Sequence, residues 1–591
     1  MNISKRAITP IISVSLLLII TILSVISFTT WYNSFSTDLF SNKLNTNSQG
    51  SSYLSIEGVF DNILYVSNPY NSNFSYKNII ISGVNCNISG SEDNQLVEIN
   101  IKSCISKLTE SVNDIIVVTD NNIISKTVFI EKEDIEKSKK INPVLFISSY
   151  GNSGLFDETS GEITIDSSNN LYITGSTRSN LSFSSSLNIT NQGSTDFFLV
   201  KIDSSGTPLY IKSSENNSGS STDSATGIAL DSNENIYISG FSRGEIEFGN
   251  GVSMPYGESG GNCYVTKYSN SGVALFSVVT HQSGNFFDIC REVAVDKNDD
   301  SFFFGGASYG NLDFGNGITL SNEGQEDFFI AKYNSSGSAL WAKSSTMGSG
   351  SGYDAGYGVS VDNFGNSYAY GRTGSDINFG EGFLTTNSGG YDFFLSKYNS
   401  SGEVQQVYTD FSNATLYDSA TEVRIDQVGN VYLLGSTESP INFGNNVKIP
   451  QPTSRTFYLV KYNSSGVAQF AYSNIPGSGG SSTPALELGS DGSIYIGGST
   501  SDNLDFGNGI NISNAGERDF FIVKLNNLGV AQNVISSSEF GGIGDEYITD
   551  LVVDDNYIYV YGTTTGNLNF GNIGSLTNNG GTDLFIIKFE E

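Results

Sequence analysis

A repeated unit constrains the fold of this chain more than any other feature of the sequence. The copy around Asp362–Gly402 contains VDNFGNSYAYG, INFGEG and YDFFLSKYNSSG in that order. The glycine that closes the second apolar segment of each copy serves as an anchor, and successive anchors are separated by 65, 65, 66, 64, 63 and 64 residues. These anchors are Gly175, Gly240, Gly305, Gly371, Gly435, Gly498 and Gly562. Such a constant period indicates repeated supersecondary units.

Each unit contains four short segments with the character of β-strands. Examples are Ile228–Leu230, Ile236–Gly240, Asp327–Lys332 and Ala339–Ala342. The segments are rich in β-branched and aromatic residues, and Gly, Asn and Ser separate them. Tandem four-stranded units that are apolar on both faces suit a β-propeller, in which neighbouring sheets bury each other's faces. The repeats therefore predict a mainly β protein with a seven-bladed propeller.

Two fragments at the ends of the repeat region predict how the ring closes. The seventh unit ends at Leu584–Phe589 and lacks a fourth strand, whereas Val144–Ile147 precedes the first unit and aligns with the fourth strands. In this alignment Phe146 corresponds to Trp341. We expect the early fragment to complete the last blade, which would remove two open sheet edges.

The repeats resemble the bacterial and archaeal β-propeller family called SBBP, and more distantly NHL repeats. The VDNFGNSYAYG and YDFFLSKYNSSG segments and their copies carry this resemblance across residues 143–589. The resemblance implies the fold of a domain at residues 143–591. It does not imply an activity, because one fold hosts many functions.

The start of the chain predicts a membrane segment. Residues 7–28 are uncharged and apolar, and this is long enough for a helix of about 20 residues that spans a bilayer. Lys5 and Arg6 precede the segment, so the positive-inside rule places the rest of the chain outside the membrane. A cleaved secretory signal peptide is an alternative.

The same stretch, KRAITPIISVSLLLIITI, resembles the class III signal peptide of archaeal type IV pilin-like proteins. The resemblance implies that residues 1–6 are a leader, cleaved between Arg6 and Ala7. Trp31, Phe35 and Leu39 recur every four residues and extend the apolar helix to about residue 50. The alternative is a plain membrane anchor that never joins other pilin subunits.

Residues 51–132 form a β-rich segment that resembles the head of those pilin-like proteins, with a linker at residues 133–142. Cys86 and Cys104 lie within this head and are candidates for a disulfide, against two free thiols. Cys263 and Cys290 in the propeller are a weaker candidate pair, since the sequence does not bring them together.

One face of the propeller is expected to carry the connections between the second and third strands, each with a Gly-Asn hairpin turn such as Leu312–Gly317. We expect these hairpins to fringe that face. It also carries the loops that enter the inner strands, with an acid 17 residues before most anchors. These acids are Asp223, Asp288, Asp354, Asp418 and Asp545, whereas the first unit has Asp157 one place earlier and the sixth has Ser481.

A ring of carboxylates near the channel could hold Ca²⁺ through oxygen ligands. The alternative is that each Asp caps its own turn. Seven lysines are also periodic, and we expect each to lay its stem along a sheet with its ammonium group in water. They are Lys201, Lys267, Lys332, Lys397, Lys461, Lys524 and Lys588.

Catalytic signals are sparse. His281 is the only histidine, which excludes Ser-His-Asp and Cys-His sites in their usual forms, and we assign no catalytic residue. The net charge of −32 argues against a nucleic-acid partner.

We therefore expect a cell-surface protein, anchored through residues 7–28 or assembled in a filament, that displays a propeller for adhesion or recognition of a glycan or protein. The alternatives are a membrane-anchored extracellular polysaccharide lyase or hydrolase, and a ligand-binding sensor or assembly scaffold.

Overall fold

The computed structural model describes part of the chain. It describes the strands between Ser55 and Phe129, strand Asn142–Tyr150, and residues 158–591 apart from 192–193, 215–221, 256–260, 283–287, 323–324, 348–351, 388, 411–415, 476–479, 572–573 and 579. The chain divides into two compact units, Met1–Lys139 and Lys140–Glu591.

The described strands of the first unit form two antiparallel sheets. One contains β1 (Ser55–Phe60), β2 (Ile63–Ser67) and β6 (Leu96–Asn100). The other contains β3 (Phe74–Ile81), β4 (Val84–Asn85), β5 (Gly90–Glu92), β7 (Val112–Thr119) and β8 (Ile123–Phe129). That this unit is a pilin-like head remains a prediction.

Several predictions at the start of the chain fall outside the described residues. These are the leader with Arg6 and Ala7, the apolar helix, and the pair Cys86 and Cys104. Within the part that the structure describes, no helix is both long and apolar enough to cross a membrane.

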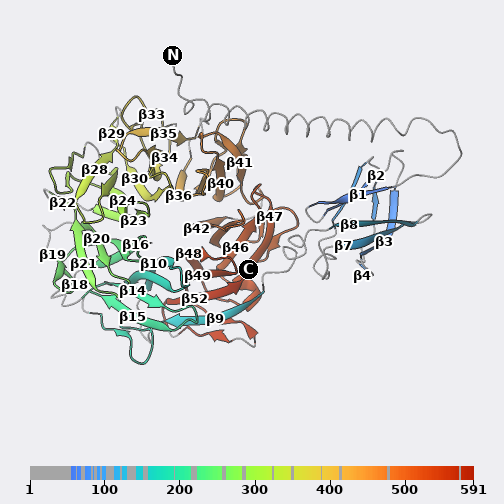
Figure 1. Cartoon of the computed structure of the whole chain (residues 1–591), viewed down its shortest axis with the longest axis horizontal. Coiled ribbons are helices and arrows are strands. Elements are labelled where there is room, and N and C mark those ends of the chain that lie inside the picture. Colours follow the sequence, from blue (N-terminus) through green and yellow to red (C-terminus); the bar gives the residue numbers. More distant parts are fainter. Residues whose placement is uncertain are drawn as a thin grey trace, which may run out of the picture. The chain divides into compact units, whose positions relative to one another are not determined.

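The second unit is a seven-bladed β-propeller, as the repeats predict (Figure 1). Each blade is a four-stranded antiparallel sheet. The first three blades are β10 (Glu158–Ile165), β11 (Leu171–Thr177), β14 (Asp196–Ile202) and β15 (Pro208–Ser213); β16 (Asp223–Leu230), β17 (Ile236–Ser242), β20 (Asn262–Tyr268) and β21 (Ala274–Val279); and β23 (Asp288–Asp296), β24 (Ser301–Ser308), β27 (Asp327–Tyr333) and β28 (Ala339–Ser344). The fourth and fifth are β30 (Asp354–Val361), β31 (Ser367–Thr373), β34 (Asp392–Tyr398) and β35 (Val404–Thr409); and β36 (Asp418–Ile425), β37 (Val431–Thr437), β40 (Thr456–Tyr462) and β41 (Ala468–Tyr472). The sixth is β42 (Ser481–Leu488), β43 (Ile494–Thr500), β46 (Asp519–Leu525) and β47 (Ala531–Ser536), followed by the 3₁₀ turn η1 (Ser537–Phe540).

The seventh blade closes the ring as predicted. It contains β48 (Glu546–Val553), β49 (Tyr557–Thr564), β52 (Asp583–Glu590) and β9 (Asn142–Tyr150), which comes from before the first blade. β9 pairs antiparallel with β52, and Lys588 lies opposite Phe146. In the third blade Lys332 lies opposite Trp341 in the same way, so the predicted match of Phe146 and Trp341 is confirmed.

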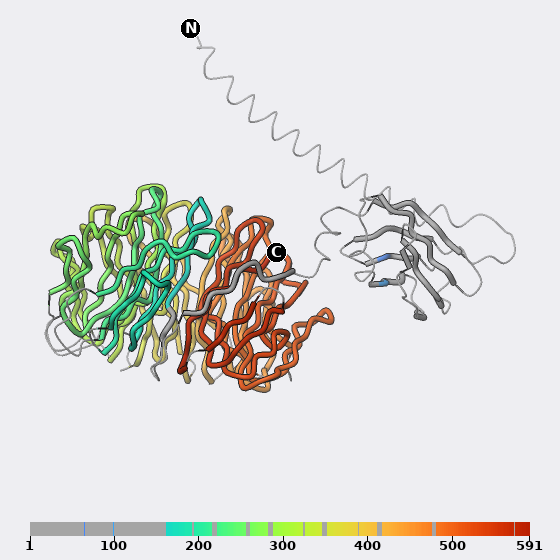
Figure 2. Tube along the Cα trace, turned by 90° about the horizontal axis from the view of Figure 1, so that it is seen from below, coloured from blue at the N-terminus to red at the C-terminus, as the bar shows by residue number. Residues whose placement is uncertain are grey.

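Apolar clusters between neighbouring blades hold the ring together. One cluster joins Ile173 and Phe198 of the first blade to Tyr561 and Ile586 of the seventh, so packing as well as pairing seals the ring. The strands of each blade run between the two faces of the propeller (Figure 2). We call these the turn face, which bears the tight first-to-second and third-to-fourth turns, and the connection face, which bears the other two connections.

The predicted hairpins form, but the expectation that they fringe the connection face is wrong. In the third blade, Asn316 Nδ2 at the hairpin tip donates a hydrogen bond of 2.9 Å to the carbonyl of Ala339, which follows a turn at the opposite face. Leu312 and Phe314 of the same hairpin are buried. The hairpin folds back along its blade because this burial removes its apolar side chains from water.

Every blade has such a hairpin. They are β12 (Leu181–Ser182) with β13 (Asn188–Ile189), β18 (Ile246–Gly249) with β19 (Val252–Met254), β25 (Leu312–Asp313) with β26 (Thr319–Leu320), β32 (Ile377–Asn378) with β33 (Leu384–Thr385), β38 (Ile441–Asn442) with β39 (Lys448–Ile449), β44 (Leu504–Asp505) with β45 (Asn511–Ile512), and β50 (Leu568–Asn569) with β51 (Ser575–Leu576). Two segments from preceding blades add to them: β22 (His281–Gln282) pairs with β25, and β29 (Thr346–Met347) with β32.

The expectation that the periodic lysines hold their ammonium groups in water is wrong for the four that are buried, Lys201, Lys267, Lys332 and Lys588. Lys267 is buried, its ammonium group lies 4.7 Å from the ring centroid of Tyr237, and it forms a 2.8 Å ion pair with Asp231. Asp231 also accepts hydrogen bonds from the backbone N–H groups of Asn233 and Asn235. Asp231 therefore stabilises its own turn through these local hydrogen bonds.

A disulfide joins Cys263 of β20 to Cys290 of β23, and therefore the second blade to the third. Their Cα atoms lie 5.2 Å apart and the bond closes a sequence separation of 27. We expect the double variant Cys263→Ala, Cys290→Ala to lose about 3 kcal/mol of unfolding free energy, since the bond no longer restricts the unfolded chain. Urea unfolding of the two proteins in oxidising buffer measures the difference, and equal midpoints would contradict a bond that stabilises the ring.

Candidate functional site: the propeller channel

Seven innermost strands surround the axis of the propeller (Figure 1): β10, β16, β23, β30, β36, β42 and β48. We call the space along this axis, which includes a cavity lined by these strands, the channel. In each blade the pairing of this strand with the second strand has a register shift at the equivalent position along the strand. In five blades the shift leaves one residue unpaired as a β-bulge. These residues are Thr226, Arg291, Tyr357, Thr421 and Thr549. All except Arg291 line a cavity of about 380 Å³, so the bulges turn their side chains into the channel.

The residues at the equivalent position alternate in type around the ring; they directly follow the shift in five blades and lie within it in the first and sixth. In blade order they are Glu162, Gly227, Glu292, Gly358, Glu422, Pro484 and Asp550. A carboxyl group therefore comes from every odd-numbered blade, and the even-numbered blades supply no side-chain charge at this height. We call Glu162, Glu292, Glu422 and Asp550 the carboxyl layer.

Three members of the carboxyl layer accept hydrogen bonds from the backbone of the neighbouring blade. Glu162 Oε2 accepts a hydrogen bond of 3.0 Å from the N–H of Ile228 in the second blade. Glu292 Oε2 accepts one of 2.8 Å from Val359 in the fourth blade, and Asp550 Oδ2 one of 3.0 Å from Ile163 in the first. These bonds cross three boundaries between blades, which is a structural role for buried carboxyl groups.

The fourth member, Glu422, pairs with a cation. Arg424 Nη1 donates to Glu422 Oε1, and Arg424 Nε lies 3.3 Å from Glu487 Oε2 of the sixth blade. The Tyr370 hydroxyl donates a 2.6 Å hydrogen bond to Glu292 Oε2 and lies 3.4 Å from Glu422 Oε1. One arginine thus balances part of the charge of a layer of four carboxyl groups.

Burial raises the pKa values of the carboxyl layer. The pKa of Glu292 rises to about 7 and that of Asp550 to about 7, in both cases because burial disfavours the ionised form more than Arg424 favours it. The pKa of Glu422 rises to about 8 for the same reason. Burial and the neighbouring carboxyl groups hold the pKa of Glu162 well above its ordinary value. The layer therefore retains protons near neutral pH.

Gly358 leaves the space that the Glu292 carboxyl group occupies. A Cβ atom built on Gly358 would collide with Glu292 Oε2 and with the Tyr370 hydroxyl. We expect Gly358→Ala to destabilise the propeller by about 1–3 kcal/mol, the usual cost of overpacking. Ser360→Ala on the same strand is the matched control. Thermal unfolding measures both, and an unchanged melting temperature for Gly358→Ala would contradict this packing.

The predicted acidic ring lies nearer the connection face, and its membership differs from the prediction. Strand register places Glu158 and Glu546, rather than Asp157 and Asp545, at the positions equivalent to Asp223 and its counterparts. The third anchor is likewise Gly306, which lies opposite Cys290, and not Gly305. Sequence alignment missed these shifts because adjacent acids and adjacent glycines are equally good matches.

Four acids of this ring each accept a hydrogen bond from a hydroxyl group on the second strand of their own blade, and Asp288 also accepts one from Thr280 of the second blade. The Thr373 hydroxyl lies 2.6 Å from Asp354 Oδ1, the Ser308 hydroxyl 2.5 Å from Asp288 Oδ1, and Ser242 and Thr437 contact Asp223 and Asp418. Among the described residues, no three His, Cys, Asp or Glu side chains form a group suited to a metal. These bonds come from hydroxyl groups on the second strand rather than from N–H groups of the acid's own turn, and Ca²⁺ binding remains an untested prediction.

The carboxyl layer itself was missed by sequence reasoning. A signal was present, since an acid directly precedes the apolar run of four inner strands, as in Glu292-Val293 and Glu422-Val423. The bulge disguised it, because the extra residue breaks the alternation that identifies which face a side chain occupies.

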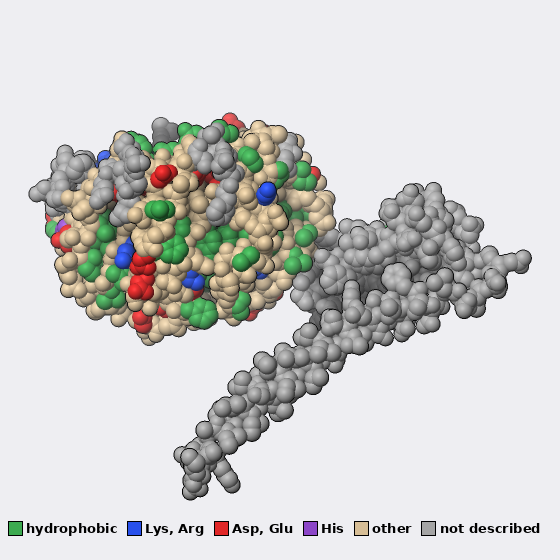
Figure 3. All heavy atoms as spheres, turned by 90° about the horizontal axis from the view of Figure 1, so that it is seen from above, with side chains coloured by type: hydrophobic (Ala, Val, Ile, Leu, Met, Phe, Trp, Pro, Cys, Tyr) green, Lys and Arg blue, Asp and Glu red, His purple; other side chains and the backbone are tan. Residues whose placement is uncertain are grey.

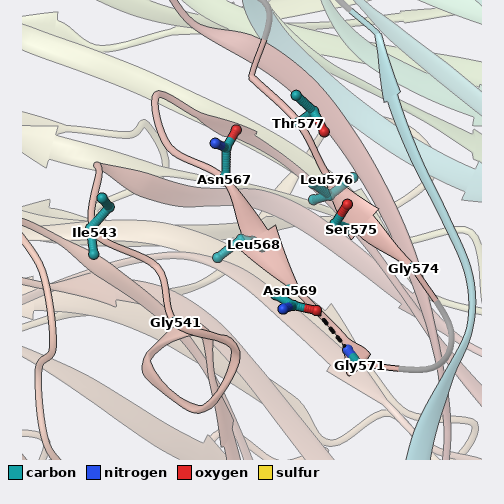
Figure 4. A pocket seen from close by; sticks show the side chains of 10 residues that line it. All are labelled: Gly541, Ile543, Asn567, Leu568, Asn569, Gly571, Gly574, Ser575, Leu576 and Thr577. Atoms are coloured by element: carbon teal, nitrogen blue, oxygen red, sulfur yellow. Dashed lines mark hydrogen bonds between the residues drawn. The ribbon is translucent and has the colours of Figure 1, made fainter.

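A second hollow lies in the seventh blade beside the β50–β51 hairpin and measures about 480 Å³ (Figure 4). No acidic or basic side chain lines it. Its Asn569 accepts a 2.9 Å hydrogen bond from the N–H of Gly571, and Asn567 accepts one from Asn578, so both amide oxygens serve local turns. The cavity in the channel, in contrast, is lined by carboxyl groups.

Comparisons with known proteins place the chain only coarsely. No known protein-family model matches it. An uncharacterized WD repeat-containing protein of Acanthamoeba polyphaga mimivirus is 24% identical over 231 residues, which cover 34% of this chain and 16% of the viral protein. This chain thus spans about a sixth of the length of that relative. The match supports a segment of propeller repeats.

Solved structures add no functional assignment. A protein of unknown function from Dyadobacter fermentans is 10% identical, with a TM-score of 0.37 over 76% of this chain and 98% of its own. Virginiamycin B lyase from Staphylococcus aureus is 8% identical, with a TM-score of 0.37 over 75% and 99%. Rhamnogalacturonan lyase from Bacillus licheniformis is 12% identical, with a TM-score of 0.28 over 89% of both chains. Similarity this low carries no argument about activity.

Proposed function

We propose that this chain is a non-catalytic ligand-binding propeller that recognises a surface glycan at the connection-face end of its channel. The observation that carries the proposal is the use made of the carboxyl layer. Three of its carboxyl groups accept hydrogen bonds from backbone N–H groups of the neighbouring blade, and the fourth pairs with Arg424. Groups engaged in this way hold the ring open around a cavity and are poorly placed to transfer protons to a substrate.

A location at the cell surface, which the sequence predicts, is part of the same proposal. The apolar segment at residues 7–28 would hold the propeller outside a membrane, as an anchor or as part of a filament with other pilin subunits. N-terminal sequencing of protein released from cell surfaces tests this part. A start at Ala7 supports pilin-type processing, and a start at Met1 supports a plain anchor.

A binding assay tests the main proposal. We expect the full chain to bind members of a glycan array and to release no product during prolonged incubation with them. Thr421→Trp would place a large ring in the cavity and should abolish binding, since Thr421 lines it. Binding that survives this substitution would contradict a site in the channel.

A membrane-anchored polysaccharide lyase or hydrolase is the second candidate. It is favoured by the raised pKa values of Glu422, about 8, and Asp550, about 7, because both line the cavity and retain protons near neutral pH. A carboxyl group of this kind can act as a general acid. Turnover of any polysaccharide that is lost in Glu422→Gln, with binding retained, would favour the enzyme over the binding module.

A further inference from the structure

An arginine and tyrosine cluster lies between the carboxyl layer and the connection face. Its members come from the third, fourth and fifth blades: Arg291 on β23, Tyr357 on β30, Arg372 on β31, and Tyr391 and Arg455 directly before β34 and β40. The guanidinium carbons of Arg291 and Arg372 lie 4.9 and 5.6 Å from the ring centroid of Tyr357. That of Arg372 also lies 4.3 Å from the centroid of Tyr391. We call these five residues the Arg–Tyr cluster.

The arginines of this cluster are not tied up in close ion pairs with the acids that the structure describes. Within the described residues, no ion pair of 4.0 Å or less includes Arg291, Arg372 or Arg455. The Nε atoms of Arg291 and Arg372 are buried and donate no hydrogen bond, whereas Arg455 Nη2 donates one of 2.9 Å to Ser436. The chain has 61 Asp and Glu against 29 Lys and Arg, so arginines outside close ion pairs are unexpected here.

Positive charge dominates the surroundings of Tyr357. Arg372, Arg291 and Arg455 act on its hydroxyl, and Glu326 is the acid that opposes them. Burial raises the pKa of Tyr357, and the three arginines limit that rise. On the side of the propeller shown in Figure 3, Lys and Arg side chains are scattered singly. The gathering of three arginines at one end of the channel therefore stands out from that surface.

The cavity beside the cluster offers groups of a different kind. Tyr357 lines it together with the hydroxyl groups of Thr226, Thr421 and Thr549. Glu162 and Asp550 of the carboxyl layer also line it. These three threonine hydroxyls already donate to backbone carbonyls. Hydroxyl groups of a ligand could therefore donate to the threonine oxygens and to the carboxyl groups. A ligand that reaches both regions would need one anionic end and a polyhydroxyl body.

We propose that the Arg–Tyr cluster binds the carboxylate of a hexuronate unit in an acidic saccharide. This proposal rests on the glycan-binding function proposed above. A guanidinium group matches a carboxylate with two parallel hydrogen bonds, and the Nε donors of Arg291 and Arg372 are unused. The Tyr357 and Tyr391 rings contact the guanidinium groups of Arg291 and Arg372 and hold them in place. The hydroxyl and protonated carboxyl groups of the adjoining cavity suit a polyhydroxyl body, which inorganic phosphate lacks.

Calorimetric titration of the full chain with galacturonic acid, galactose and inorganic phosphate tests the ligand class. We expect galacturonic acid to bind at least about 10-fold more tightly than galactose, since a hydrogen bond to a charged group contributes about 1.5–3 kcal/mol. Arg372→Gln should weaken galacturonic acid binding by about 10-fold or more and leave galactose binding unchanged. Arg178→Gln, an exposed arginine of the first blade, is the matched control and should change neither.

Different failures have different meanings. Equal affinity for galacturonic acid and galactose, with loss of both in Thr421→Trp, would overturn the hexuronate assignment and leave the channel as a glycan site. Stronger binding of phosphate, or of a peptide with a free rather than amidated C-terminal carboxylate, would also overturn it. Absence of binding by every saccharide would overturn the proposed function as well. Far-ultraviolet circular dichroism and the melting temperature confirm that Arg372→Gln is folded, so that a loss of affinity reports on the site.

Discussion

Removal of β9 should open the propeller. A chain that begins at residue 151 lacks the fourth, outermost strand of the seventh blade, so that the outer edge of β52 is left unpaired. We expect its unfolding free energy to fall by more than about 4 kcal/mol, beyond the usual range for single substitutions, because a whole strand and its packing are lost. The open edge should also promote aggregation.

The matched control for this deletion is a chain that begins at residue 140. It lacks the first compact unit and retains β9. Thermal unfolding and light scattering of the two truncated proteins and the full chain measure the effect. Equal stability of the two truncated proteins would show that β9 contributes nothing to closure.

Raising the pH from 5 to 9 should destabilise the propeller. The unfolded carboxyl groups of Glu292 and Glu422 titrate near 4.5, whereas in the folded protein burial raises their pKa values to about 7 and about 8. Their contribution to stability is therefore complete below pH about 4.5 and is lost as the pH rises through about 7–8, because the folded state holds protons that the unfolded state releases. Asp550, with a pKa of about 7, acts in the same direction.

Glu292→Gln isolates this effect from the self-repulsion of an acidic chain. Its amide oxygen can still accept from Val359 and Tyr370, but the side chain no longer titrates. We expect the variant to match the natural protein at pH 5 and to be about 1–3 kcal/mol more stable at pH 9, since one pKa unit corresponds to about 1.4 kcal/mol. Parallel denaturant curves at the two pH values measure the difference. A variant that is less stable at both would assign Glu292 a required negative charge.

The sequence predicted the architecture because the repeat encodes it several times. Seven copies of the same strand pattern identify the blades, and the orphan strand with Phe146 identifies the closure, since strand pairing and side-chain alternation leave one register. The folded-back hairpins could not be predicted in the same way. Their position depends on where Phe314 and its counterparts find a buried site, which is a property of the assembled blade.

The candidate site was less accessible to sequence reasoning than the fold. The predicted acids such as Asp354 are regular in sequence because every blade needs the same local hydrogen bond. The groups that face the channel are irregular, with arginine, tyrosine or threonine at the bulge and glutamate or glycine after it. Only the assembled ring brings Arg291, Tyr357 and Arg372 together from two blades.

The position of β9 in the chain also makes closure of the ring depend on completed synthesis. β9 leaves the ribosome before any blade, yet its pairing partner β52 follows six complete blades. The first six sheets can assemble as they emerge, while the ring waits for a contact of very large sequence separation. Until then β9 must remain unpaired and available. A chain whose translation stops early would therefore expose a propeller with an open ring to cellular quality control.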